Sequence, residues 1–560
     1  MKKHIVLMIA VAACLMILSP GHARVTSQVW SKTHLPVPAN PPAFKNPKIE
    51  PTLLRLAIEP QSQAPAKTTG AAQFRKQALN ADNTVRIVLE AQTMVPQGMQ
   101  DLIVPYVSQL VTSLGGRVET TYHSLVQASV PVSALLPLAG SPAVRYVRRP
   151  LVPRLLDVTS EGVAYTGADA WIKLAPFHVS GQAVKICILD LGFQGYSSLK
   201  GNELPSDVVT ESFRADGDIE AGEVHGAACA EIVHDMAPDA KLYLVNFDTD
   251  VEQHNAVDWI ISQGVNVISY SIGWTNAGAG DGTGPIDADV DKTAEKNIVW
   301  ASSAGNYATD HYEGAFSDPD SDGWHNFSGI DEILEFEVPA YEVVGAALNW
   351  DDWGTWDGAN YSGAANDYNL YLYIWTGLAW QLVDSSTYPQ TGGGEWPTED
   401  IYGWYADFTT HWGVAIRKVH ATRNCKLEIF TYGNDSTIEY DVPWGSLAIP
   451  ADSPNAVTAG AVSWSNDAYH YYSSRGPTHD GRIKPDFGSP SGVSTDTYGN
   501  QGFYGTSASA PHVAGAFGLM LGRTPYSPGQ IYRILQDRAV DLGTPGKDNM
   551  FGWGRLNLKK

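Results

Sequence analysis

Cysteine and long apolar segments are both scarce in this chain of 560 residues. The four cysteines are Cys14, Cys187, Cys229 and Cys425. Because Cys14 falls in the N-terminal apolar segment, an odd number remains, and no complete disulfide framework is expected. That segment, residues 5–18, is short for a bilayer span. The composition therefore argues against a disulfide-rich scaffold and against a stable membrane span.

Basic residues are also few, with 37 Lys and Arg against 60 Asp and Glu, and the net charge is −23 at pH 7. An acidic chain repels phosphate backbones, which argues against nucleic-acid binding. The charges are unevenly distributed along the chain: residues 1–155 carry 16 basic and 6 acidic side chains, whereas the remainder carries 21 basic and 54 acidic. Attraction between the two parts is therefore expected.

The first 23 residues have the features of a secretory signal peptide. Lys2 and Lys3 form a basic start, residues 5–18 an apolar centre, and residues 21–23 a small-residue end. An alternative is a lipobox ending at Cys14, which would leave a lipid-anchored protein. Because residues 15–18 stay apolar, cleavage after Ala23 is favoured, and the protein is predicted to be secreted, extracellular or periplasmic.

The run Gly-Thr-Ser-Ala-Ser-Ala-Pro-His-Val-Ala-Gly at residues 505–515 is the most informative segment. A serine becomes a nucleophile only when a base removes its proton and a rigid frame presents its oxygen. Small residues on both sides of Ser507 leave room for a substrate backbone. The apolar residues 513–521 predict a buried helix that would hold the serine firmly.

Two earlier segments supply possible partners for Ser507. Residues 184–190 form an apolar run that ends in Asp190, as expected of a buried parallel strand with a carboxylate at its carboxyl edge. Residues 225–233 begin with His225-Gly226 and continue as a helix with an apolar face. The order along the chain is therefore Asp, His, Ser. Chymotrypsin uses another order, and no Gly-x-Ser-x-Gly elbow surrounds Ser507.

These motifs together resemble those of subtilisin-like serine peptidases, the subtilase family. The resemblance covers residues 160–306 and 450–560. It implies that His225 is the general base, that Asp190 orients it, and that Ser507 attacks the peptide carbonyl. In Ala304-Gly305-Asn306, which resembles the oxyanion segment, Asn306 would stabilise the intermediate together with the Ser507 amide. A sedolisin-type acid peptidase is disfavoured because it would carry Glu where His225 stands.

The resemblance also implies a site for protein or peptide substrates. Residues 265–274 are similar to the strand that pairs with the substrate backbone through main-chain hydrogen bonds. The loop after this strand is rich in glycine, so no side-chain preference is predicted. The expected substrate-binding residues are Ser271, Ile272, Gly273, Ser303, Ala304 and Gly305.

Strand-like and helical segments alternate around the motifs, which predicts an α/β fold with a three-layer parallel sheet over residues 156–309 and 451–560. Residues 310–450 are additional, rich in Trp and Tyr, and divided by glycine turns. They are expected to form an inserted all-β sandwich, similar to a jelly roll. Its aromatic residues fit a hydrophobic core better than a sugar-binding platform.

Residues 24–80 are rich in Pro and Ala and predict a leader or linker. Residues 81–155 predict a small α+β domain at the place where subtilases carry a propeptide. The resemblance implies that this domain is the protein's own inhibitor and folding partner. Cleavage that releases it is expected between residues 144 and 167.

Acidic clusters raise the question of calcium, although no cofactor is required for the chemistry. Asp318, Asp320 and Asp322 have the spacing that begins a calcium loop, but Gly329 stands where an EF-hand needs Glu. A second group comprises Asp351, Asp352 and Asp367. A structural calcium site and a solvated acidic turn remain equal alternatives, and no ligand is assigned.

The sequence therefore predicts a secreted, autoprocessing serine endopeptidase made as a zymogen and acting as a monomer. Two alternatives remain open. The same acyl-enzyme intercepted by an amine would make a peptide ligase or maturase. Alternatively, the chain would be a surface-binding protein that acts through its insert.

Overall fold

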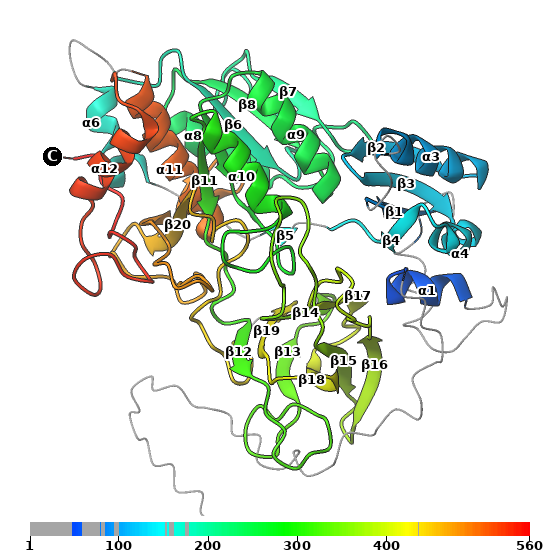
Figure 1. Cartoon of the computed structure of the whole chain (residues 1–560). Helices are drawn as coiled ribbons and strands as arrows, with labels where there is room; N and C mark the ends of the chain where they lie inside the picture. Colours follow the sequence, from blue (N-terminus) through cyan, green and yellow to red (C-terminus); the bar gives the residue numbers. More distant parts are fainter. Residues whose placement is uncertain are drawn as a thin grey trace, which may run out of the picture.

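The computed structural model describes residues 48–58, 79, 84–93, 100–151, 154–155, 162–173, 179–434, 436–522 and 524–559. Figure 1 shows three units: a small α+β domain in blue and cyan, a central α/β unit, and an all-β unit in yellow and green. The predicted signal peptide and most of the predicted leader lie outside the described residues.

A seven-stranded parallel sheet forms the middle layer of the central unit, in the order β21-β20-β11-β9-β6-β8-β7. Because all of its strands are parallel, their carboxyl ends meet at one edge, where open α/β sheets build their sites. The strands are β6 (Lys185–Asp190), β7 (Val209–Ser212), β8 (Lys241–Asn246), β9 (Val267–Tyr270), β11 (Val299–Ser303), β20 (Ala456–Ser463) and β21 (Phe487–Ser491).

Helices cover both faces of this sheet (Figure 1). In β6, Ile186 and Ile188 pack into the core beneath α8 (His225–Met236), α11 (Thr506–Leu521) and α12 (Pro528–Arg538). Cys187 and Leu189 point to the other core, beneath α9 (Asp250–Ser262) and α10 (Pro285–Glu295). Side chains of a strand alternate between faces, so one apolar run serves two cores. The predicted three-layer α/β fold is confirmed.

Helix α11 is buried along almost its whole length, and two glycines allow the close packing. A Cβ at Gly515 would lie 2.3 Å from that of Met236 in α8, and one at Gly518 would lie 2.4 Å from Ile186 Cδ1. The helix that carries Ser507 is therefore held against both α8 and the sheet.

Shorter elements complete the central unit. They are α5 (Val163–Thr166), α6 (Ala168–Ile172), α7 (Tyr196–Leu199), the hairpin of β22 (Val493–Thr495) and β23 (Gly499–Phe503), and the antiparallel pair of β5 (Arg154–Leu155) and β10 (Ile272–Gly273).

The small domain has the β-α-β-β-α-β order of a split βαβ fold, with a four-stranded antiparallel sheet β2-β3-β1-β4. Its elements are β1 (Thr84–Ala91), α3 (Gln100–Ser113), β2 (Arg117–Tyr122), β3 (Leu125–Pro131), η1 (Val132–Ala134), α4 (Leu135–Gly140) and β4 (Val144–Arg148). A further helix, α1 (Pro51–Ile58), adds Leu53, Leu54 and Leu56 to its core. The prediction for residues 24–80 was a leader or linker without this helix, because the many Pro and Ala residues around it made its apolar side chains hard to recognise.

The inserted unit is a sandwich of two antiparallel sheets, β12-β19-β14-β17 and β13-β18-β15-β16. This strand order is that of a jelly roll, as predicted. Trp350, Tyr368 and Trp412 lie in the core between the sheets, so these aromatic residues are structural. The strands are β12 (His311–Ala315), β13 (Leu334–Val338), β14 (Val343–Trp350), β15 (Asp367–Trp375), β16 (Trp380–Ser386), β17 (Thr398–Tyr405), β18 (Thr410–His420) and β19 (Lys426–Tyr432).

The small domain docks on the first turn of α9 through charged and polar side chains. Arg86 Nη1 lies 2.8 Å from Asp248 Oδ2, and its Nη2 pairs with Glu252. Thr249 Oγ1 donates to Gln127 Oε1 over 2.5 Å. Acidic residues at a helix N-terminus are stabilised by the helix dipole, which makes this end of α9 a suitable acceptor for arginine.

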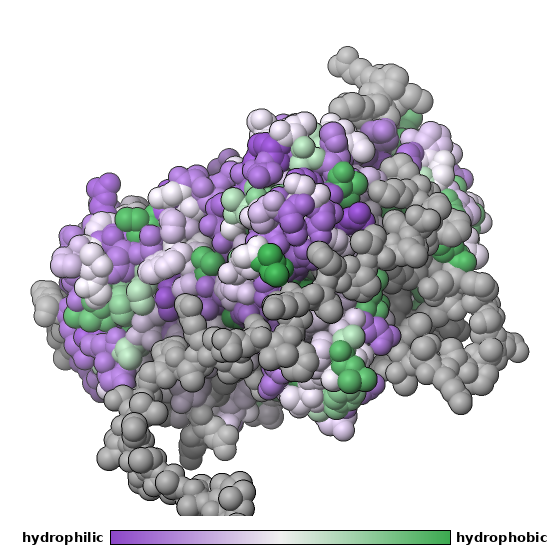
Figure 2. Space-filling model, turned by 90° about the horizontal axis from the view of Figure 1, so that it is seen from below, coloured by the Kyte–Doolittle hydropathy of each residue, from purple (hydrophilic) through white to green (hydrophobic). Residues whose placement is uncertain are grey.

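The face of the molecule seen in Figure 2 is mostly hydrophilic, with hydrophobic residues scattered singly or in small groups. Within the described part of the chain, no helix has the length and apolarity needed to cross a membrane.

Candidate active site

Asp190 and His225 form a buried pair at the carboxyl edge of the sheet. Asp190 ends β6, and His225 opens α8. His225 Nδ1 lies 2.9 Å from Asp190 Oδ2, and both side chains are almost fully buried. The amide of Leu191 donates to Asp190 Oδ1 over 2.8 Å, which fixes the carboxylate. The pair thus directs Nδ1 toward the carboxylate and leaves Nε2 as the nitrogen for proton transfer.

Gly226 explains why the histidine motif reads His-Gly. A Cβ at this position would come within 2.6 Å of the Gly192 carbonyl oxygen and 2.9 Å of Asp190 Cβ. A larger residue would therefore push α8 away from the strand that carries Asp190. The glycine allows the close approach that the pair needs.

Ser507 is the second residue of α11 and is tied to the predicted substrate strand. Its hydroxyl donates to the Ser271 carbonyl over 3.2 Å, and the Ser271 hydroxyl donates to the Ser507 carbonyl over 2.8 Å. Cys229, one turn after His225, lies with its sulfur 3.7 Å from the same carbonyl. The structure therefore brings the start of α8, the start of α11 and Ser271 together.

Asn306 follows β11 and is oriented by the residue before the nucleophile. Its Oδ1 accepts from the Thr506 amide over 3.0 Å and from the Thr506 hydroxyl over 3.1 Å. Because Oδ1 binds Thr506, the Nδ2 amide group of Asn306 points away from Thr506 and can act as a hydrogen-bond donor. Sequence reasoning identified Asn306 but missed Thr506, although Thr506 stands within the serine motif, between Gly505 and Ser507.

The remaining predicted residues line the strand next to this site. Ile272 and Gly273 of β10 pair antiparallel with Leu155 and Arg154 of β5, so a peptide strand lies in the predicted substrate position. Ser303 Oγ donates to the Ile272 carbonyl over 3.4 Å. Ala304 and Gly305 lie beside it, but the Ala304 amide and carbonyl bond to Ala459 and Ala448. The backbone groups of Ala304 are thus already paired, and its side chain is buried beside Leu447 and Ala451.

The loop after β10 is held by the jelly roll, which sequence reasoning missed. Tyr361 Oη accepts from the Ala279 amide over 3.0 Å and donates to the Thr283 carbonyl over 2.5 Å. Asn276 Nδ2 donates to the Glu399 carbonyl over 3.2 Å. His479 binds both the Ala279 carbonyl and Glu428 of the insert. The glycine-rich loop is thus fixed by side chains far away in the sequence.

Burial shifts the pKa values of three titratable groups in the segments that carry His225 and Ser507. Burial lowers the pKa of His512 to about 4, so the histidine of the serine motif is neutral. Burial raises the pKa of the Cys229 thiol well above its ordinary value, so this cysteine is no thiolate nucleophile. Burial also raises the pKa of Glu231 to about 7, and this residue accepts from the backbone of Asp496 and Thr497.

The two acidic groups considered for calcium differ. The carboxylates of Asp318, Asp320 and Asp322 lie close enough together to share one cation. In the second group, Asp351 pairs with Arg423 over 2.8 Å, and Asp352 Oδ2 accepts from Asn366. Protein donors also reach Asp318, from the Asp322 and Gly323 amides. Of the two groups, the first is the one that gathers three carboxylates around one point.

Comparison with known proteins agrees with this geometry. The model of the Subtilase family matches residues 181–328 and 396–554, together more than half of the chain. An extracellular serine protease of Serratia marcescens is 30% identical over 169 residues, which is 25% of this chain and 16% of that protein. The minor extracellular protease Epr of Bacillus subtilis (strain 168) is 37% identical over 78 residues, 13% of this chain and 12% of its own length.

Among solved structures, the CspB protease of Clostridium perfringens aligns with a TM-score of 0.47 and 14% identity, covering 71% of this chain and 95% of that one. The chain spans about a sixth or less of the length of the curated relatives given above. The family match includes the segments that carry Asp190, His225, Asn306 and Ser507. The chain belongs to the subtilase family.

Proposed function

We propose that the protein is a secreted serine endopeptidase that acts as a monomer and releases its own small domain. The observation that carries this proposal is the pairing of β5 with β10, because it lays the chain's own peptide along the strand next to Ser507. The Asp190–His225 pair at the same edge supplies the base.

The chemistry follows from these positions. His225 Nε2 accepts the Ser507 hydroxyl proton as the oxygen attacks a peptide carbonyl, and Asp190 stabilises the imidazolium that forms. The oxyanion of the tetrahedral intermediate would accept hydrogen bonds from Asn306 Nδ2 and the Ser507 amide. His225 then returns the proton to the leaving amine, and water hydrolyses the acyl-enzyme by the same steps.

The first cut is proposed to lie between Leu155 and Gly162. Leu155 is opposite Ile272, and Gly162 precedes α5 of the central unit, beside His512 and Pro490. This range lies within the one expected from the sequence. Calcium, if bound at the Asp318 group, would stabilise the insert and take no part in the reaction.

The test is intact mass and casein hydrolysis of the protein begun at residue 24, beside its Ser507→Ala variant. The active protein should shorten by about 14 kDa, as expected for a small domain of this length, and digest casein, whereas the variant should do neither. If both proteins stay full length and casein stays intact, the proposal is wrong. Excess aminolysis over hydrolysis products would instead favour the ligase alternative.

A second variant tests the oxyanion role separately. Asn306→Ala should lower kcat by about 10² to 10³ with little change in KM, the usual effect of losing one oxyanion donor. Asn297→Ala, a change at a turn before β11, serves as the matched control and should retain activity. An unchanged kcat in Asn306→Ala would remove Asn306 from the mechanism.

A further inference from the structure

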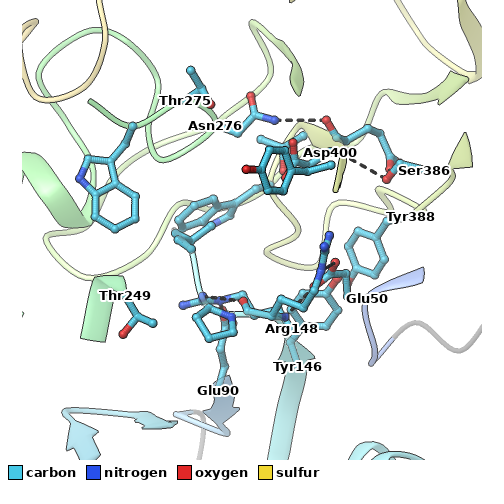
Figure 3. A pocket seen from close by; sticks show the side chains of 18 of the residues that line it. Glu50, Glu90, Tyr146, Arg148, Thr249, Thr275, Asn276, Ser386, Tyr388 and Asp400 are labelled. Carbon is cyan, nitrogen blue, oxygen red and sulfur yellow. Dashed lines mark hydrogen bonds and ion pairs between the residues drawn. The ribbon is translucent and has the colours of Figure 1, made fainter. Parts of the chain in front are cut away.

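A cavity of about 760 Å³ lies where the small domain, the central unit and the jelly roll meet. Trp274, Thr275 and Asn276, which directly follow β10, form part of its wall. Figure 3 shows Arg148 and Tyr146 of the small domain facing Tyr388 and Asp400 of the insert around this cavity. The cavity therefore continues the peptide site toward the N-terminal side of a bound substrate.

The walls contributed by the central unit and the insert are acidic and aromatic. Asp248 and Asp400 supply carboxylates, and Tyr388 and Tyr402 supply rings. Burial raises the pKa of Glu399 well above its usual value, so this wall residue adds no charge. Such walls attract basic side chains, and aromatic faces stack on guanidinium groups or other rings. A substrate with an acidic segment here would be repelled.

The chain's own segment shows how a peptide occupies this region. Arg148 Nη2 lies 2.6 Å from Asp250 Oδ2 in the first turn of α9. The Leu151 amide donates to Asp250 Oδ1 over 3.3 Å, and its carbonyl accepts from the Asp250 amide over 3.3 Å. The Asp250 carboxylate thus binds both the Arg148 side chain and the backbone of Leu151, three residues later.

Tyr146 contacts the insert, whereas Arg149 pairs with Glu50 over 2.6 Å and feels the charges of Asp400 and Asp384 in the insert. Burial lowers the pKa of Arg149, but the carboxylates of Glu50, Asp400 and Asp384 outweigh this effect and raise it. The rings of Tyr146 and Tyr388 lie with their centroids 4.9 Å apart. Of these partners, only Glu50 belongs to the N-terminal part of the chain, so the insert keeps its own acceptors when that part leaves.

Release of the small domain would leave Asp250 without its arginine. Asp250 is only 2% exposed while Arg148 is bound. A carboxylate built to hold a cation is costly to leave unpaired where water has poor access. A substrate arginine at the corresponding place would restore the pair.

We propose that the first turn of α9 and the β16–β17 side of the jelly roll form a distal subsite for basic, aromatic segments of protein substrates. Leu155 is the residue opposite Ile272, and Arg148 and Arg149 precede it by seven and six residues. The subsite should therefore bind substrate arginines about six or seven residues before the substrate residue that lies opposite Ile272. This inference rests on the proposed endopeptidase activity and names the substrate class of that site.

The test uses the self-processed enzyme and two quenched fluorescent peptides. One copies residues 144–166 of this chain, and the other carries alanine in place of Arg148 and Arg149. The arginine peptide should have a KM lower by about tenfold or more, with similar kcat, because the contacts are remote from the reacting bond. In Asp250→Asn and, separately, Asp400→Asn, this advantage should shrink.

Glu337→Gln removes one exposed carboxylate from the insert outside the cavity and is the matched control, in which the full preference should persist. Equal KM values for the two peptides in the unmodified enzyme would overturn the subsite. So would an arginine peptide that only inhibits, or one left uncut while casein is digested. If neither peptide nor casein is cut, the proposed activity itself fails and the subsite fails with it.

Discussion

The central unit contacts the small domain and the jelly roll by different means. Toward the small domain it presents carboxylates, with Asp248 and Glu252 around Arg86 and Asp250 holding Arg148. Toward the insert it uses mainly neutral hydrogen bonds, such as those from Tyr361 to the loop after β10. The insert is also joined to the central unit covalently at both ends, whereas the proposed cut leaves the small domain without a covalent link.

This difference indicates which attachment is built to be reversible. Ion pairs at an interface depend on salt and on the protonation of both partners. Neutral hydrogen bonds between well-packed groups change little over the same conditions. These contacts suit the roles proposed above, with the small domain as a removable inhibitor and the insert as a permanent wall of the substrate site.

The largest effect is expected from Arg86→Ala, which removes an arginine from the ion pairs between the small domain and the central unit. Arg86 is paired with Glu252, whose side chain is 1% exposed. Removing one partner of a buried pair typically costs about 3–5 kcal/mol, so the cleaved small domain should inhibit about 150-fold to several thousand-fold more weakly. The inhibition constant against casein hydrolysis measures this.

Arg117→Ala is the control for that experiment, because the Arg117 side chain is 68% exposed and lies 3.6 Å from Glu119. It should leave the inhibition constant nearly unchanged. Equal effects of the two substitutions would mean that the ion pairs do not hold the small domain.

Tyr361→Phe weakens the neutral hydrogen bonds between the insert and the central unit. It removes the hydroxyl that binds Ala279 and Thr283, so the loop beside β10 should lose its fixed position. We expect KM for a peptide substrate to rise about tenfold, the usual scale for a lost buried hydrogen-bond partner, while the inhibition constant of the small domain changes less. Tyr341→Phe, at an 81% exposed side chain of the same insert, is the control.

Salt should separate the two interfaces without any substitution. Raising the ionic strength from about 0.05 M to 0.5 M shortens the screening length several-fold. The small domain should then inhibit a few-fold more weakly, whereas KM for a short uncharged peptide should stay constant. A parallel rise in both quantities would contradict the distinction between the interfaces.

The smallest effect is expected from pH, acting on the charged link that His479 makes between the insert and the loop after β10. Burial lowers the pKa of His479, but the Glu428 carboxylate outweighs it and raises the pKa to about 9. Because the pKa in the folded state is the higher one, the link stabilises fully below about pH 6.5. This stabilisation is lost as the pH rises through 9.

In the Ser507→Ala background, Tm should therefore fall between pH 7 and pH 10, and His479→Gln should flatten that fall by about 2–4 °C. His420→Gln, at an exposed histidine of the insert, should not. An unchanged pH dependence in His479→Gln would show that the link contributes nothing to stability.

Much of the fold was predictable because its signals are local. The apolar run before Asp190, the alternation of strands and helices, and the glycine turns of the insert each lie within one short segment. Helix α1 was not predicted, since Leu53, Leu54 and Leu56 become an apolar face only against the small domain's core. The strand order of the sandwich depends on pairings such as His311 with Phe430, which no local pattern encodes.

The candidate site divides in the same way. Asp190, His225, Asn306 and Ser507 each sit in a recognisable motif, and the structure places these motifs at one edge of the sheet. Their catalytic roles remain predictions. The contact of Tyr361 with Ala279 and that of Arg148 with Asp250 were missed, because each joins residues far apart in the chain with no motif to mark them.

The jelly roll leaves and rejoins the central sheet at neighbouring strands, since Ser303 of β11 pairs with Ala459 of β20. The inserted residues therefore connect two adjacent strands, as a short loop would. Closing a longer loop adds little entropic cost. A single genetic insertion or exchange at this point changes the wall of the substrate site without moving the strands that carry the catalytic motifs. Selection can therefore alter what the enzyme recognises independently of how it reacts.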